Sequence, residues 1–247
     1  SLRARDELIQ AAKLAALGQM AAGIVHEVNQ PVSAIRSYAE NARLLLDRGR
    51  LDLVRSNLDE IAELTERMAK ITRQLKTFAR KSSGILAPVS PRAVVEHALG
   101  LLSAQTNDLG AEIVFELPEM APLVMADEAR LEQVLVNLLR NALDAVSARN
   151  HRLITVSLGE DEEHVLLSVR DSGPGIDAED LPRLFDPFFT TKEVGEGLGL
   201  GLSISYGIVQ GFGGRIWAAN HPDGGAVFTV ALRRAPEAEK TPSSPSS

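Results

Sequence analysis

The chain has 247 residues, a length that allows one large domain or two domains of modest size. Its 45% hydrophobic and 24% charged residues are typical of a globular protein and exclude a disordered or collagen-like chain. The net charge of −7 disfavours non-specific nucleic-acid binding, and the absence of cysteine excludes a disulfide framework, a thiolate zinc site and a cysteine nucleophile. Because no apolar run approaches about 18 residues and the N-terminus is charged, we expect no membrane contact within this stretch and no signal peptide.

Residues 1–84 are expected to form a helical hairpin. Apolar or small residues recur at alternating steps of three and four over 14–45 and again over 54–75, with one turn signal at Asp47–Arg50 between them. This spacing is a heptad seam, so we predict two antiparallel helices of about 30–45 residues, the second ending near Gly84. A further apolar stripe widens the face of the second helix beyond what one hairpin covers. Two hairpins would cover it, which predicts a homodimer held together by a four-helix bundle.

Residues 88–235 are expected to fold as one α/β domain. Helical stretches at 92–105 and 127–149 alternate with short runs, several of them rich in β-branched residues. Residues 236–247, which contain Pro, Ser and Thr, are expected to be a disordered tail. The expected strands are Glu112–Leu117, Leu153–Leu158, Val165–Asp171, Arg215–Ala219 and Ala226–Leu232.

His26 is the first candidate for chemistry. It lies two residues, or about 200°, from the seam positions on either side, so its side chain is expected to point away from the bundle core. Glu27 follows directly, Gln30 lies one turn later on the same face, and Pro31 is expected to bend the helix at a cost of about 3 kcal/mol. A neutral imidazole is nucleophilic at pH 7, and a carboxylate that accepts one ring proton holds its tautomer. The alternative is a solvated surface histidine.

Two further motifs suggest a nucleotide site. Asn137 and Asn141 share one face of an amphipathic helix, and amide oxygens are suitable Mg²⁺ ligands where phosphates supply the other oxygens. Asp171 follows a strand and is flanked by the glycines of Asp171–Ile176, so it can accept a hydrogen bond from an adenine amine and would reject guanine. The alternatives are two solvated asparagines and an ordinary turn.

The segment after residue 184 adds an aromatic cluster and a glycine-rich run. Phe185–Lys192 contains three phenylalanines and a lysine, which alone would be a small satellite core. Gly195–Ser205 has alternating glycines whose backbone N–H groups can wrap phosphates at a helix N-terminus. It is neither a Walker loop nor a dinucleotide fingerprint, because the Gly-Lys pair and the third glycine are missing. One such run is weak evidence for nucleotide binding, whereas four blocks in order are strong evidence.

These blocks together resemble the cytoplasmic core of a two-component sensor histidine kinase. His26–Pro31 resembles its phosphoacceptor box, Asn137–Ala145 the N box, Asp171–Gly175 the first glycine box, Phe185–Lys192 the F box and Gly195–Leu200 the second glycine box. The runs Ala15–Gly23 and Asn29–Pro31 resemble a subgroup that includes dicarboxylate-sensing, oxygen-sensing and nitrogen-regulatory kinases, of which the dicarboxylate type is nearest.

The resemblance implies a role for each matched residue. His26 would receive the γ-phosphoryl group, Glu27 would be the general base, and Gln30 would orient water for regulator dephosphorylation. Asn141 and Asn137 would bind Mg²⁺, and Asp171 would read adenine in a base pocket lined by Gly173 and Gly175. Relatives often have threonine where Ala226 follows Gly225, so a water-mediated adenine contact there is in doubt. The remaining implied nucleotide-site residues are Asp144, Thr190, Thr191, Lys192, Gly195, Gly197, Leu198, Gly199 and Leu200.

The resemblance further implies an ATP-dependent protein-histidine kinase that uses Mg²⁺. It would contain a dimeric helical hairpin and a GHKL-type α/β-sandwich ATP-binding domain, and would pass its phosphoryl group to the receiver domain of a response regulator. The implied location is cytoplasmic, either as a soluble protein or as the cytoplasmic part of a membrane-anchored receptor. Two alternatives are a chaperone- or topoisomerase-type ATPase, which leaves His26 and Glu27 unexplained, and a degenerate kinase that acts as a dimeric scaffold.

Overall fold

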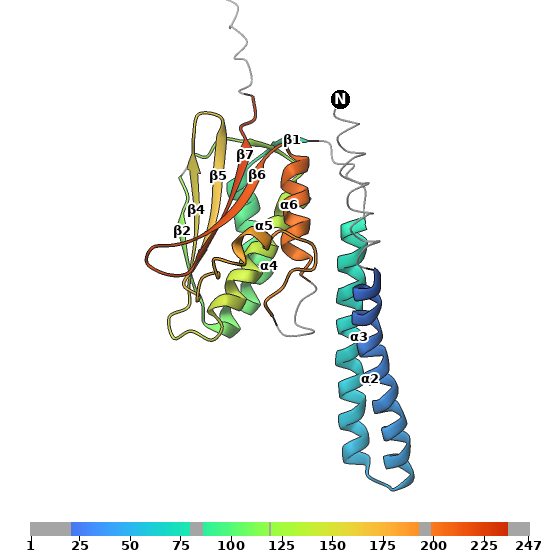
Figure 1. Ribbon diagram of the computed structural model, residues 1–247. Helices are drawn as coiled ribbons and strands as arrows, with labels where there is room; N and C mark the ends of the chain where they lie inside the picture. Colours follow the sequence, from blue (N-terminus) through green and yellow to red (C-terminus); the bar gives the residue numbers. More distant parts are fainter. Residues whose placement is uncertain (1–20, 80–85, 119, 193–198, 237–247) are drawn as a thin grey trace, which may run out of the picture. The chain divides into compact units, whose positions relative to one another are not determined.

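A computed structural model gives the fold of the protein and describes residues 21–79, 86–118, 120–192 and 199–236. The chain separates into two compact units, one containing the two long helices and Phe185–Ile204, and the other containing residues 83–184 and 205–247. The expected fold class, a helical hairpin followed by an α/β domain, is confirmed (Figure 1).

The hairpin consists of α2 (Ala21–Asp47) and α3 (Leu51–Ala79), which pack against each other. The seam follows the predicted positions on α2, but on α3 it uses Asn57 where the three-and-four spacing predicts Leu58, whose side chain is exposed. Gly49 makes the turn between them with a left-handed φ of 71°, a conformation that glycine adopts without a steric penalty. The helix continues through Pro31, whose side chain is buried. Asn57 is buried in the seam and donates a hydrogen bond to the carbonyl oxygen of Tyr38 at 3.4 Å.

The second unit contains a five-stranded mixed sheet in the order β2-β4-β5-β7-β6. Strands β2 (Glu112–Glu116) and β4 (Leu153–Glu160) run parallel, and the other neighbours run antiparallel. The remaining strands of this sheet are β5 (His164–Asp171), β6 (Arg215–Asn220) and β7 (Ala226–Arg233). All five strands were expected from the sequence. The two-stranded pair β1 (Ala87–Val89) and β3 (Val124–Ala126) was not among the expected strands.

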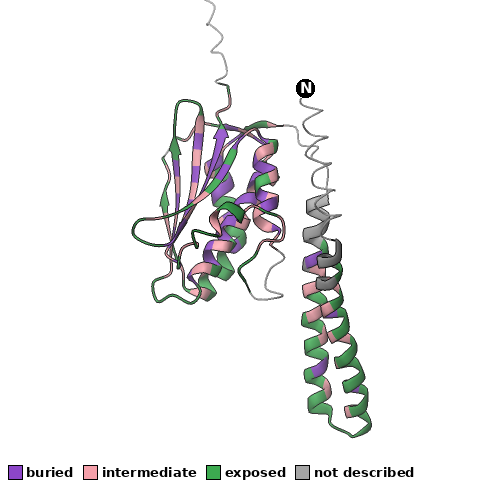
Figure 2. Ribbon diagram, viewed as in Figure 1, coloured by how far each residue is buried: buried purple, intermediate pink, exposed green. Residues whose placement is uncertain are grey.

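Helices α4 (Pro91–Leu109), α5 (Glu128–Val146) and α6 (Gly201–Gly211) lie on one face of this sheet (Figure 1). Each of α4 and α5 begins at a side chain that caps a free backbone N–H, because Ser90 accepts from Ala93 and Asp127 accepts from Arg130. The apolar face of α5 and alternate residues of β4 and β5 are buried between the helices and the sheet (Figure 2). This core fixes the end of β5, where the candidate site begins.

None of the helices in the described ranges combines the length and apolar character needed to cross a bilayer. The expected cap at Gly84 and residues 237–247 of the expected tail lie outside the described residues.

Candidate functional site

Asp171 is a buried carboxylate at the end of β5, with 3% of its surface exposed. Its Oδ1 accepts hydrogen bonds from the backbone N–H of Gly173 at 2.8 Å and of Ala226 at 3.3 Å. Burial raises the pKa of Asp171, although these two N–H groups and the charge of Arg170 act in the opposite direction. The described residues give Oδ2 no hydrogen bond, so this oxygen is available to accept one from a ligand.

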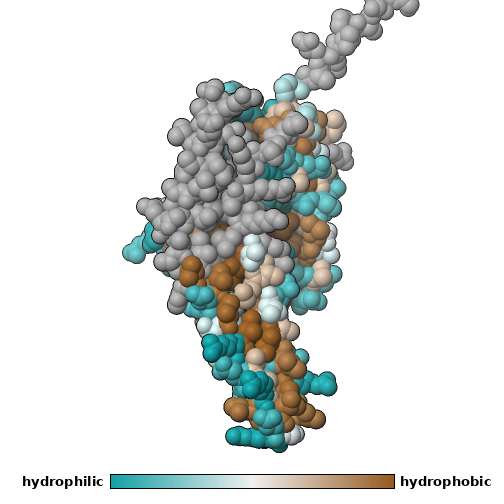
Figure 3. Space-filling view, turned by 90° about the vertical axis from the view of Figure 1, so that its right-hand side faces the viewer, coloured by the Kyte–Doolittle hydropathy of each residue, from teal (hydrophilic) through white to brown (hydrophobic). Residues whose placement is uncertain are grey.

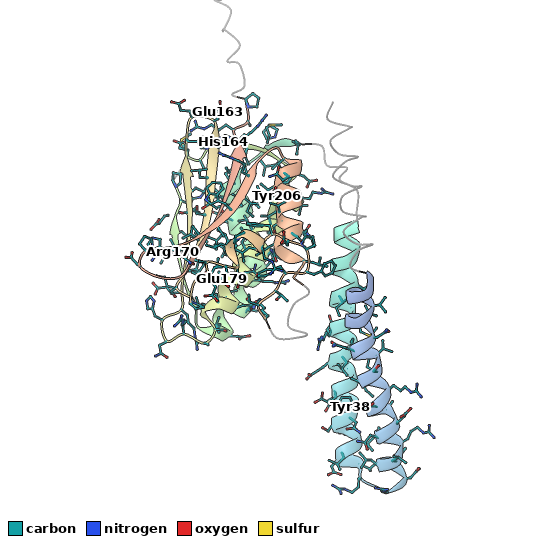
Figure 4. The ribbon with its side chains drawn as sticks, in the orientation of Figure 1. Tyr38, Glu163, His164, Arg170, Glu179 and Tyr206 are labelled. Atoms are coloured by element: carbon teal, nitrogen blue, oxygen red, sulfur yellow. The ribbon has the colours of Figure 1, made fainter. Side chains whose placement is uncertain are left out.

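Arg170 stands at the end of β5 from which the Asp171 loop leaves, and His164 stands at the other end (Figure 4). The guanidinium of Arg170 lies 3.9 Å from the carboxylate of Asp223. Because the Asp223 side chain is 80% exposed, this ion pair adds little stability. The ion pair does link the end of β5 to the turn between β6 and β7, which also contacts Asp171.

Glycines allow the backbone to pass close to Asp171. A Cβ atom at Gly173 would lie 2.7 Å from Oδ1 of Asp171 and 2.9 Å from Cβ of Ala145 on α5. Gly225 has a φ of 82°, and a Cβ atom there would collide with the carbonyl oxygen of Asp171. Larger residues at these positions would displace the carboxylate, so the glycine-rich sequence is explained by close packing around one acidic side chain.

The predicted metal ligands on α5 differ in their surroundings. Asn137 donates from Nδ2 to the Oγ of Ser205 on α6 at 3.0 Å, and its own Oδ1 is an acceptor. Asn141, one turn later, is partly buried, and its side chain makes no hydrogen bond with any described residue. Asp144 is exposed near the C-terminal end of the same helix. Asn141 is therefore better suited than Asn137 to offer an amide oxygen to a Mg²⁺ ion bound together with phosphates.

No group of three or more His, Asp or Glu side chains in the described ranges could hold a metal ion. A Mg²⁺ ion that takes oxygens from one amide, from substrate phosphates and from water does not need such a group. The donors on α5 therefore fit the metal that the family resemblance implies.

The F box and the second glycine box meet at their backbones. Phe188 has a left-handed φ of 66°, which is unusual for a bulky residue, and its N–H donates to the carbonyl oxygen of Gly199 at 3.0 Å. Gly199 also has a positive φ, of 62°, and a Cβ atom there would collide with the backbone of Phe188. Leu200 is buried and packs with Phe188 and Ile204. The two motifs, predicted separately, therefore form one local structure.

The remaining predicted site residues lie on α2, in the F box or outside the described residues. The side chains of His26 and Glu27 lie outside the described residues, although both residues belong to α2. Gln30 is partly buried on the same helix. Thr190, Thr191 and Lys192 are exposed, and the Lys192 N–H donates to Oγ1 of Thr190 at 3.2 Å. Gly195, Gly197 and Leu198 lie outside the described residues.

Two residues near the site were not found from the sequence. Asn220 ends β6 and hydrogen bonds to the backbone of Ile176, in the loop that follows Asp171. Ser205, which is buried, bonds to Asn137. Asn220 lies in no recognisable motif, Ser205 ends the glycine-rich run without matching one of its glycines, and both bond to partners far away in the sequence. Gly175, by contrast, was predicted, and it lies against Asn220.

Comparison with known proteins identifies both halves of the chain. Residues 126–236 match the family described as histidine kinase-, DNA gyrase B- and HSP90-like ATPase, and residues 16–84 match the His Kinase A (phospho-acceptor) domain. The first region includes Asn137, Asn141 and Asp171, and the second includes His26.

Relatives share this similarity over most of the chain. The C4-dicarboxylate transport sensor protein DctB of Pseudomonas aeruginosa is 44% identical over 232 residues, which are 94% of this chain and 38% of that protein. Sensor protein FixL of Bradyrhizobium diazoefficiens is 37% identical over 237 residues, which are 94% of this chain and 46% of that protein. The chain thus spans less than half the length of either relative.

Solved structures agree. The catalytic domain of histidine kinase ThkA is 31% identical, with a TM-score of 0.55, over 61% of this chain and 96% of that one. Histidine kinase ThkA in complex with response regulator protein TrrA is 26% identical, with a TM-score of 0.74, over 96% of this chain and 67% of that one. With both family regions matched, the chain belongs to the sensor histidine kinase family, as a phosphoacceptor domain followed by an ATPase domain.

Proposed function

We propose that this chain binds Mg·ATP, transfers the γ-phosphoryl group to His26 and passes it to an aspartate of a response regulator. Residues 1–84 would be the dimerisation and phosphotransfer domain, and residues 88–235 would be the catalytic domain. The observation that carries the proposal is the carboxylate of Asp171, which is buried with one oxygen bonded to backbone N–H groups and the other left for a ligand. It occurs in a chain whose residues 16–84 match a phosphoacceptor domain.

The geometry around Asp171 supports a proposal for how the nucleotide is bound. Oδ2 of Asp171 accepts a hydrogen bond from the 6-amino group of adenine, and guanine, which has a carbonyl oxygen there, is disfavoured. Asn141, with Asn137, would hold Mg²⁺, which when bound would neutralise charge on the triphosphate. The glycines beside Asp171 let the base approach the backbone closely. The family resemblance further proposes Asp144, Thr190, Thr191 and Lys192 as nucleotide contacts, and Gly195, Gly197, Leu198, Gly199 and Leu200 as the residues of an ATP lid.

The proposed phosphoryl transfer forms a bond between His26 and the γ-phosphorus. One ring nitrogen of the neutral imidazole attacks the γ-phosphorus, the bond to the β,γ-bridging oxygen breaks, and ADP leaves. Glu27 accepts the proton from the other ring nitrogen as charge develops. The resulting N–P bond then breaks when a carboxylate oxygen of the regulator takes the phosphoryl group. Positioning and charge neutralisation account for most of the catalysis, because little covalent chemistry is required of the protein.

The hairpin supports the proposed homodimer. Among the described residues of α2 and α3, the only buried apolar side chains are those of Pro31, Ala42 and Ile71. Large apolar side chains instead remain exposed at seven-residue spacing, one position after the seam on each helix, so they lie on one side of the hairpin. Figure 3 shows apolar side chains gathered along this part of the molecule. They are Val25, Val32 and Leu46 on α2, and Leu51 and Leu58 on α3.

The partner and setting are proposed from the relatives. One solved relative is bound to a response regulator, so we propose a receiver domain as the phosphoryl acceptor here. Gln30 would hold the water that attacks the regulator's aspartyl phosphate when the kinase acts as a phosphatase. The identity to C4-dicarboxylate transport sensors supports membership of that subgroup. Dependence on ATP supports a cytoplasmic location for this part of the protein.

The proposal is tested by incubating the protein with γ-labelled ATP and Mg²⁺. A kinase gives label on protein that acid removes and base does not, whereas an ATPase of another kind gives free phosphate and a scaffold gives neither. His26→Gln should abolish the label while the protein still binds ATP. The matched control is His151→Gln, because His151 is an exposed histidine outside the proposed site. Label that survives in His26→Gln would show that another residue accepts the phosphoryl group.

A further inference from the structure

The loop that follows Asp171 is held at its far end by one side chain. Oδ1 of Asn220 accepts a hydrogen bond from the N–H of Ile176 at 2.8 Å, and Nδ2 of Asn220 donates to the carbonyl oxygen of Ile176 at 2.7 Å. The side-chain amide therefore pairs with both polar backbone groups of one residue, as a neighbouring strand would. This pairing fixes which side-chain atom is oxygen and which is nitrogen.

The contact between the loop and Asn220 requires glycine at position 175. Gly175 has a left-handed φ of 83°, and a Cβ atom there would lie 2.9 Å from Oδ1 of Asn220. The loop can therefore approach the end of β6 closely enough for the paired hydrogen bonds only because residue 175 is glycine. An aspartate at position 220 could accept from Ile176 but could not donate to it, and a glutamine would be one methylene too long.

The hydrogen bonds join parts of the sheet that are not neighbours. Strand β7 lies between β5 and β6, so Asn220 reaches past β7 to the loop that leaves β5. The start of β7 holds the other end of the same loop, because the N–H of Ala226 bonds to Oδ1 of Asp171. Asn220 and Ala226 are register partners in the β6–β7 hairpin. One hairpin end thus holds both the carboxylate and the far end of its loop.

We infer that Asn220 is a positioning residue for nucleotide recognition, which holds the Asp171–Ile176 loop in its binding conformation through Ile176. The inference rests on the proposed ATP site and adds to it a residue that touches no nucleotide. Because Asn220 is exposed, each of its two hydrogen bonds should contribute a free energy at the lower end of the usual range. Loss of both should raise the dissociation constant of Mg·ATP by about 5- to 30-fold.

The test compares Asn220→Ala and Asn220→Asp with the wild-type chain by calorimetric titration with Mg·ATP. The matched control is Asn150→Ala, because Asn150 is exposed and makes no hydrogen bond through its side chain with the described residues. Both Asn220 variants should bind ATP more weakly, and the control should not. In a chain that already carries Asp171→Asn, adding Asn220→Ala should weaken binding less than twofold, because Asp171 no longer reads the base.

Two results would overturn the inference. One is unchanged ATP affinity in folded Asn220→Ala. The other is an equal loss of ATP affinity when Asn220→Ala is made in the wild-type chain and in the Asp171→Asn chain, which indicates a general structural role. If the variants do not fold, amide hydrogen exchange of Ile176 in the wild-type protein decides, since fast exchange contradicts the paired hydrogen bonds. A wild-type chain that fails to bind Mg·ATP refutes the proposed function instead, and is thereby distinguished from these results.

Discussion

Replacing Asp171 by asparagine separates base recognition from folding. Oδ1 faces two backbone N–H groups, so the new side chain must keep its oxygen there and place its NH₂ group where Oδ2 was. An amine donor of adenine then meets a donor instead of an acceptor. One hydrogen bond to a charged group is lost, worth about 1.5–3 kcal/mol, which lowers ATP affinity by about 10- to 150-fold. Guanine, with an acceptor at that edge, should lose much less.

The same change should not destabilise the protein at neutral pH. Burial raises the pKa of Asp171 above its ordinary value of 3.8, so the folded state binds a proton at this carboxyl more tightly than the unfolded state does. Its contribution to stability is fully present below 3.8 and is lost as the pH rises through the folded-state pKa. Asparagine does not ionise, so a variant with asparagine at position 171 loses no stability in this pH window. The melting temperature of Asp171→Asn should therefore rise relative to wild type as the pH increases through that window.

Calorimetric titration with Mg·ATP and Mg·GTP measures the first effect, and thermal melts between acid and neutral pH measure the second. Asp108→Asn is the matched control, because Asp108 is exposed on α4 and its side chain makes no hydrogen bond with described residues. A folded Asp171→Asn variant with wild-type ATP affinity would show that Asp171 does not read adenine. A melting-temperature difference that stays constant with pH would refute the argument from the buried charge.

Three further predictions concern the metal, the dimer and the phosphatase step. Asn141→Ala should weaken Mg²⁺-dependent ATP binding about tenfold and leave metal-free binding unchanged, and equal affinities with Mg²⁺ would remove Asn141 from the metal site. Val32→Glu combined with Leu46→Glu should convert a dimer into a monomer in sedimentation experiments, while Ser37→Glu, on an exposed position of the same helix, should not. Gln30→Ala should slow the decay of phosphorylated regulator and spare phosphorylation of the kinase, whereas equal decay rates would exclude this role.

The fold was predictable where a periodic pattern extends over several turns or strand residues. The seven-residue spacing of α2 and α3, the apolar face of α5 and the alternation along β5 each repeat often enough to identify the element. β1 and β3 have three residues each, too few for a period to show, and they form because distant segments pair. The parallel pairing of β2 with β4 likewise depends on the topology of the whole sheet.

The site was predictable where chemistry and spacing coincide locally. Asp171 follows a strand and is flanked by glycines, and Asn141 stands one turn from another asparagine, so the sequence could name both as candidates. It could not name Asn220, because an asparagine at the end of a strand is common and its partner, Ile176, is 44 residues away. Only the strand order, in which β7 lies between β5 and β6, brings these two residues together.

Ala226 shows why a departure from the family pattern need not weaken the site. Relatives of this fold often have threonine at this position, where a hydroxyl can hold a water beside adenine. Here the backbone N–H of Ala226 bonds to Oδ1 of Asp171, and any residue except proline provides that donor. Gly225 before it allows the close approach, since a side chain there would collide with the Asp171 carbonyl oxygen. The orientation of Oδ2 therefore depends on the backbone of the β6–β7 hairpin, and alanine removes only the contribution that a threonine hydroxyl would add.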